Sequence, residues 1–153
     1  MEGFGIRAIE RQRRVLLVDD DPGDTLMIRE AIESFAPETD LATVGDGVDA
    51  LRYLRGQDEF ADSPRPDLVL LDLNMPRKDG REVLAEVKAD TKLQAIPVVI
   101  LTTSSAAQDI LRSYQLHANA YVTKPTDIDG LTAVVRCIER FFGRVVQAPP
   151  YPA

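Results

Sequence analysis

The feature that most constrains the fold is a series of short, largely apolar runs separated by amphipathic segments. The runs lie at 15–18, 41–44, 68–71, 96–101 and 120–123. Their length is typical of buried strands and falls far below the roughly 18 residues needed to span a bilayer. Strands with so little polar alternation are typical of parallel sheets that helices cover on both faces.

Amphipathic helical patterns alternate with these runs. Apolar residues at three- and four-residue spacing predict a helix after the first run, with Asp24 as its N-cap and Pro37 as its end. Similar patterns predict helices through 50–54, 83–87, 110–114 and 131–138, the last one capped by Asp127. The fold class that follows is α/β, with five helices around a doubly wound, five-stranded parallel sheet.

Length and composition limit the class of protein. A chain of 153 residues is long enough for one core and too short for two. We expect an N-terminal extension over 1–13, a folded domain over 14–142, and a proline-rich tail over 143–153. The net charge of −7 argues against a nucleic-acid partner.

Cellular location is predicted from what the sequence lacks. The single cysteine, Cys137, allows no internal disulfide, which agrees with a reducing compartment. The sequence shows neither a bilayer-spanning segment nor a signal-peptide pattern, so we expect no membrane partner and a cytoplasmic location.

Polar residues follow four of the predicted strands. Asp19 and Asp20 follow the first strand, Asp72 the third, Thr102 the fourth and Lys124 the fifth. Because parallel strands bring their carboxyl ends to one edge of the sheet, these side chains are expected to meet there. The three aspartates carry a formal charge of −3, which Mg²⁺ and the Lys124 ammonium would balance.

This set of groups predicts phosphoryl transfer to a carboxylate. A carboxylate can act as a nucleophile and form an aspartyl phosphate. Such a transfer needs mainly positioning and neutralisation of the phosphoryl oxygens, which a metal ion, a lysine and a hydroxyl can supply. Thr102 would supply the hydroxyl and Lys124 the ammonium.

Four motifs in order carry a resemblance to the receiver domain of bacterial two-component response regulators. They lie at 16–22 (LLVDDDP), 70–76 (LLDLNMP), 99–104 (VILTTS) and 121–125 (YVTKP). Two segments, 85–90 (AEVKAD) and 118–125 (ANAYVTKP), look most like the stand-alone receivers paired with phytochrome-type histidine kinases. The resemblance implies a flavodoxin-like sheet of strand order 2-1-3-4-5.

The resemblance also implies a metal site. Asp72 would be the residue phosphorylated by a sensor histidine kinase. Asp20 and Asp72 would bind Mg²⁺ directly, the backbone carbonyl of Asn74 would be the third protein ligand, and Asp19 would act through water.

The same resemblance implies a switch. Thr102 would move toward one phosphoryl oxygen and Lys124 would pair with another. Tyr121 would be an aromatic side chain that moves inward with Thr102, and Pro125 would follow a cis peptide bond.

Two residues between these motifs have structural interpretations. His117 stands where the family commonly has glycine, at the end of the fourth helix, in a place that suits a left-handed conformation. Ser105 is expected to cap the fourth helix.

The function expected is a phosphoacceptor that catalyses its own phosphorylation and dephosphorylation, and is not otherwise an enzyme. Its output would be protein contact, with a homodimer formed through the fourth and fifth helices or through the tail. A relay intermediate or a phosphate sink would use the same site. An aspartyl-phosphate phosphatase usually has a second aspartate at the position of Asn74, and a flavin carrier would not place Asp19 to Asp21 beside its phosphate.

Overall fold

The computed structural model describes residues 13–142. The tail predicted for 143–153, and the extension predicted for 1–13 except residue 13, lie outside this range. Within the described part of the chain, no helix is long and apolar enough to cross a membrane.

Helices and strands alternate along the described chain. In order they are β1 (Arg14–Val18), α2 (Pro22–Phe35), β2 (Asp40–Val44), α3 (Gly47–Leu54), the 3-10 turn η1 (Asp58–Phe60), β3 (Leu68–Leu71), α4 (Gly80–Ala89), β4 (Val98–Thr102), α5 (Ala107–Gln115), β5 (Ala120–Thr123) and α6 (Ile128–Arg140).

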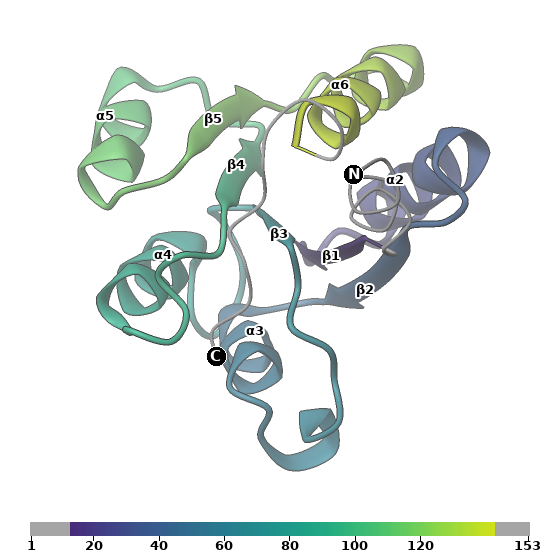
Figure 1. Ribbon diagram of the computed structural model, residues 1–153. Coiled ribbons are helices and arrows are strands. Elements are labelled where there is room, and N and C mark those ends of the chain that lie inside the picture. The colour runs from purple at the N-terminus through teal and green to yellow at the C-terminus, as the bar shows by residue number, and fades with distance from the viewer. Residues whose placement is uncertain (1–12, 143–153) are drawn as a thin grey trace, which may run out of the picture.

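The strands form one parallel sheet in the order β2-β1-β3-β4-β5. The predicted fold class and strand order are therefore confirmed. The central strand β3 pairs with β1 and β4 and is buried along its whole length, because helices cover the sheet on both faces (Figure 1).

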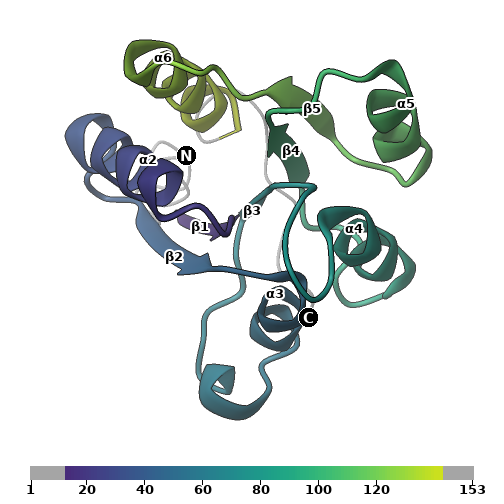
Figure 2. The same cartoon turned by 180° about the vertical axis from the view of Figure 1, so that it is seen from behind.

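Alternate residues of the central strands pack into two separate cores. Leu16 and Leu71 point into the core that α3 and α4 cover, whereas Leu17 and Leu70 point into the core formed with α2 and α6. Figure 2 shows α2 and α6 together on one side of the sheet and α3 and α4 on the other. The three central strands β1, β3 and β4 therefore end in buried residues, which places their carboxyl ends at one edge of the sheet.

Aspartates cap most of the helices. Asp21, not the predicted Asp24, caps α2 by accepting hydrogen bonds from the amides of Gly23 and Asp24. The helix begins earlier than predicted because Pro22 occupies its first turn, where a missing amide proton costs nothing. Asp127 caps α6 as predicted.

Helix α5 lies beside the edge strand β5 and exposes much of its surface. Leu111 and Tyr114 are largely exposed, and among its residues only Ser113 is fully buried. The Tyr114 hydroxyl accepts a hydrogen bond from the backbone amide of Tyr121 at 3.2 Å. The prediction that Ser105 caps this helix is wrong, because its N-cap position is Ala106.

The turn after α5 contains His117 at a φ of 72°. This left-handed conformation, which a non-glycine residue adopts at a cost, was predicted for this position. The turn leads directly into β5, so it helps to place the strand that ends at Lys124.

Candidate functional site at the carboxyl edge of the sheet

Three aspartates meet at the carboxyl edge of the sheet. The backbone amide of Asp72 donates to Val18 at 3.0 Å and that of Asp19 donates to Val44 at 3.1 Å, so the sheet ladder itself positions both residues. Carboxylate oxygens of Asp19, Asp20 and Asp72 all lie within 4.8 Å of one another. The predicted convergence of these side chains is confirmed.

Lys124 is the cation of the cluster. Its ammonium lies 2.9 Å from Asp19, 2.9 Å from Asp24 and 3.5 Å from Asp72, and the side chain is almost fully buried. Burial alone would lower the pKa of Lys124, but its hydrogen bonds to Asp19 and Asp24 outweigh that effect and hold the pKa above its ordinary value. Lys124 therefore stays protonated and delivers a fixed positive charge to the site.

Asp19 is the most deeply buried carboxylate of the three. One oxygen accepts from Lys124, and the other accepts from the backbone amide of Asp21 at 2.9 Å. Burial raises the pKa of Asp19, although both hydrogen bonds oppose the rise. A further positive charge beside Asp19 would offset the cost of its burial.

The cluster fits a hard divalent cation. Asp24 joins the predicted aspartates through Lys124, so the cluster holds four carboxylates and one ammonium and its local formal charge is −3. Mg²⁺ prefers oxygen ligands and binds through one or two carboxylates, with waters and phosphate oxygens completing its coordination. Asn74 is exposed in the loop that follows Asp72, and its role as a carbonyl ligand stays a prediction.

Thr102 lies at the end of β4 with its side chain completely buried. Its hydroxyl has no hydrogen-bond partner. A buried hydroxyl without a partner is costly, so it indicates a place where a polar ligand atom is expected. Its role toward a phosphoryl oxygen stays a prediction.

The Tyr121 hydroxyl is one end of a series of polar contacts that runs through the β4–α5 loop. Its hydroxyl donates to the Ser104 carbonyl at 2.8 Å, and burial raises the pKa of this hydroxyl. The Ser104 hydroxyl donates to Asp109 at 2.6 Å, and Asp109 pairs with Arg81 at 2.7 Å. The loop that begins at Thr102 is thus tied to α4 and to β5.

The prediction of a cis peptide bond before Pro125 is wrong. This bond is trans, and no peptide bond within residues 13–142 is cis. Trans is the lower-energy form of a prolyl bond by about 0.5–1 kcal/mol. With the trans bond in place, Lys124 still reaches Asp19, Asp24 and Asp72.

Sequence reasoning missed the place of Asp24 in the site by making it a helix cap. The available signal was Pro22, which favours the first helical position. That position would have made Asp21 the cap and put Asp24 in the first turn, beside the end of β1.

Comparison with known proteins agrees with this geometry. Residues 15–136 match the response regulator receiver domain family. The response regulator Rcp1 of Synechocystis sp. is 44% identical over 135 residues, which cover 88% of this chain and 92% of Rcp1.

Solved structures give the same result. The crystal structure of the phosphorylated cyanobacterial phytochrome response regulator RcpA superimposes with a TM-score of 0.89 at 44% identity, covering 92% of this chain and all of RcpA. The Mn²⁺-bound form of Rcp1 superimposes with a TM-score of 0.86 at 43% identity, covering 90% of this chain and 99% of that one.

The family match over residues 15–136 and the geometry of the site together identify a receiver domain. The chain belongs to the response regulator receiver domain family, and its relatives include phytochrome response regulators.

Proposed function

We propose that Asp72 accepts a phosphoryl group from a sensor histidine kinase and that this modification switches the protein's contacts. The observation that supports the proposal best is the arrangement around Asp72. Its carboxylate lies beside Asp19 and Asp20, within reach of the Lys124 ammonium. The hydroxyl of Thr102, at the end of the neighbouring strand β4, has no partner.

The transfer is a nucleophilic displacement at phosphorus. An oxygen of the Asp72 carboxylate forms the new O–P bond while the P–N bond of the kinase phosphohistidine breaks. The electron pair of that bond returns to the imidazole nitrogen. Because the chemistry requires mainly positioning and charge neutralisation, the receiver can also use a small acyl phosphate as donor.

The charged groups of the site would divide the work. Asp19, Asp20, Asp72 and the Asn74 carbonyl would hold Mg²⁺, which supplies positive charge to the phosphoryl oxygens when it is bound. Lys124 would bind another phosphoryl oxygen as an ammonium. The same groups would let the protein assist its own dephosphorylation by orienting water at the phosphorus.

The output would pass through Thr102 and Tyr121. The Thr102 hydroxyl gains its missing partner when it donates to a phosphoryl oxygen, and this pulls on the β4–α5 loop. Tyr121 is bonded to that loop at Ser104, so it would follow the movement.

The partner that fits this site is a histidine kinase, and the similarity to phytochrome response regulators favours a bacteriophytochrome. A cytoplasmic location follows from that partnership, because the kinase must reach Asp72. The acidic net charge of −7 supports protein partners and not nucleic acid. A relay intermediate would differ in passing the phosphoryl group on to a second histidine.

A homodimer through α5, β5 and α6 is part of the proposal. Leu111 of α5 and Ile128 of α6 are apolar side chains that remain mostly exposed, and Tyr114 of α5 is about half exposed. Covering them with a second copy would remove apolar area from water.

The decisive experiment measures intact mass after incubation with acetyl phosphate and Mg²⁺. We expect one added phosphoryl group, lost in Asp72→Asn and in a sample treated with EDTA. Size exclusion of the same samples tests the homodimer. A folded wild-type protein that gains no phosphoryl group would refute the proposal.

A further inference from the structure

The loop between β3 and α4 follows Asp72 directly and carries Asn74. Both of its ends are fastened by backbone hydrogen bonds: the Gly80 amide donates to Leu73 at 2.8 Å, and the Gly47 amide donates to Lys78 at 3.0 Å. A Cβ atom on Gly47 would lie only 2.2 Å from the Lys78 oxygen, so this contact with α3 requires glycine. The loop is therefore held against the start of α3.

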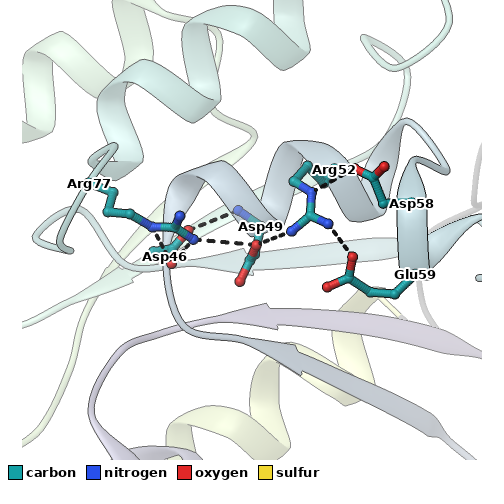
Figure 3. A network of polar contacts seen from close by, with 6 residues as sticks. All are labelled: Asp46, Asp49, Arg52, Asp58, Glu59 and Arg77. Atoms are coloured by element: carbon teal, nitrogen blue, oxygen red, sulfur yellow. Dashed lines mark hydrogen bonds and ion pairs between the residues drawn. The ribbon is translucent and has the colours of Figure 1, made fainter.

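Arg77 forms a third connection between this loop and α3. Its Nε and Nη2 atoms donate to one Asp46 oxygen at 3.0 and 2.6 Å, and Nη2 lies 3.4 Å from Asp49 (Figure 3). The backbone of Arg77 has a φ of 65°, a left-handed conformation that is unfavourable for arginine. The loop thus keeps a costly conformation in which the guanidinium reaches both carboxylates.

Asp46, to which Arg77 binds, is itself held in place by the start of α3. Asp46 caps α3, with its other carboxylate oxygen accepting from the Asp49 amide at 2.8 Å. Burial would raise the pKa of Asp46, but the bonds from the Asp49 amide and from Arg77 outweigh it and lower the pKa. Asp46 is therefore a charged carboxylate fixed to the first turn of a helix.

We propose that Arg77 is a positioning residue that sets the place of the Asn74 carbonyl, and through it the affinity of the Asp72 site for Mg²⁺. This inference rests on the proposed function. Arg77 is about half exposed and its contacts are with α3, so it acts through the loop. Loosening the loop would let the Asn74 carbonyl move relative to Asp72, which lies two residues earlier in the same segment.

Another arginine of the same network provides a matched control. Arg52 pairs with Asp49, Asp58 and Glu59, and so ties α3 to the turn η1 and not to the loop after Asp72 (Figure 3). Removing Arg52 also deletes one guanidinium from this network, although its side chain is only 26% exposed. It leaves the contact between Arg77 and Asp46 in place.

The test compares Arg77→Ala, Arg77→Gly, Arg77→Lys and Arg52→Ala with the wild-type protein. Calorimetry gives the Kd for Mg²⁺, and hydrogen exchange of the Gly80 and Lys78 amides in EDTA reports the loop without metal. We expect Arg77→Ala and Arg77→Gly to raise the Kd by about three- to tenfold and to speed exchange at both amides. Arg77→Lys should recover part of the affinity, and Arg52→Ala should stay within about twofold of wild type.

The glycine variant separates the side chain from the backbone, because it removes the guanidinium and relieves the strained φ. Wild-type affinity and exchange in Arg77→Ala would overturn the inference while leaving the proposed function intact. Absence of Mg²⁺ binding by the wild-type protein would instead refute the proposed function, and hydrogen exchange would still decide whether Arg77 holds the loop. Should Arg77→Ala fail to fold, Asp46→Asn removes the ionic partner while keeping a good helix cap.

Discussion

Replacing Asp72 by asparagine should stabilise the protein in the absence of metal. The change keeps the shape of the side chain and removes one negative charge from a cluster in which carboxylate oxygens lie within 4.8 Å of one another. Asp72 lies 3.5 Å from the Lys124 ammonium, farther than Asp19 and Asp24, which both lie at 2.9 Å. The sign of the effect depends on whether repulsion from Asp19 and Asp20 exceeds that attraction.

The distances allow an estimate of the difference. With an effective dielectric constant of about 20, two like charges at 4.8 Å, the upper limit of these separations, repel by about 3.5 kcal/mol. The attraction to Lys124 at 3.5 Å is about 4.7 kcal/mol on the same scale. Two repulsions exceed one attraction by about 2 kcal/mol, and exposure of Asp20 to water reduces the net gain to about 1 kcal/mol.

The assay is urea unfolding followed by circular dichroism, in EDTA and in Mg²⁺. In EDTA, Asp72→Asn should unfold with a free energy about 1 kcal/mol above wild type. At a Mg²⁺ concentration ten times the Kd, wild type should gain about 1.4 kcal/mol, and the variant should gain less at the same concentration because it lacks a carboxylate that we propose as a Mg²⁺ ligand. The exposed residue Asp62, changed to asparagine, controls for the same alteration in net charge and should shift stability by less than about 0.5 kcal/mol. If Asp72→Asn is no more stable than wild type in EDTA, the electrostatic reasoning is refuted.

Three further predictions concern single residues. Thr102→Val keeps the volume of the side chain and removes a buried hydroxyl without a partner, so the free energy of unfolding should rise by about 1 kcal/mol, and a lower melting temperature would contradict this. His117→Gly relieves the φ of 72° and should add about 0.5 kcal/mol, measured by urea unfolding; a loss would show that the histidine side chain is needed. The lowered pKa of Asp46 stabilises the fold above the ordinary carboxyl pKa, and this contribution is lost as the pH falls through the folded value. The stability difference between wild type and Asp46→Asn should therefore shrink from pH 5 to pH 3. A difference that stays constant would show that the charge of Asp46 does not stabilise the fold.

The strands and the carboxylate cluster could be predicted because they depend on local signals. A short apolar run identifies a buried strand, and parallel strands bring the residues after them to a common edge. Asp19, Asp72 and Lys124 each follow such a run directly, so their meeting required no knowledge of loop conformation. Strand order came from the motifs, and the structure confirms it.

Contacts that depend on how helices start and how they rotate could not be predicted in the same way. Arg81 and Asp109 are 28 residues apart on different helices, and their pairing depends on the rotation of α4 and α5 relative to one another. The pairing of Asp24 with Lys124 depends on where α2 begins, and α2 begins at Pro22, before the predicted cap Asp24. Periodicity predicts which face of a helix is buried but does not predict which side chains of two helices touch.

The hydrogen bond from the Tyr121 amide to the Tyr114 hydroxyl has a consequence for assembly. Strand β5 is an edge strand of the sheet, as β2 is, and unpaired amides on such a strand are a template onto which another chain can add. Tyr114 occupies one of these donors with a side chain from the neighbouring helix. The strand is only four residues long, so this single cap removes much of its capacity to recruit a further strand. Growth of the sheet into an aggregate is thereby opposed on the same side of the molecule where Leu111 and Ile128 are exposed.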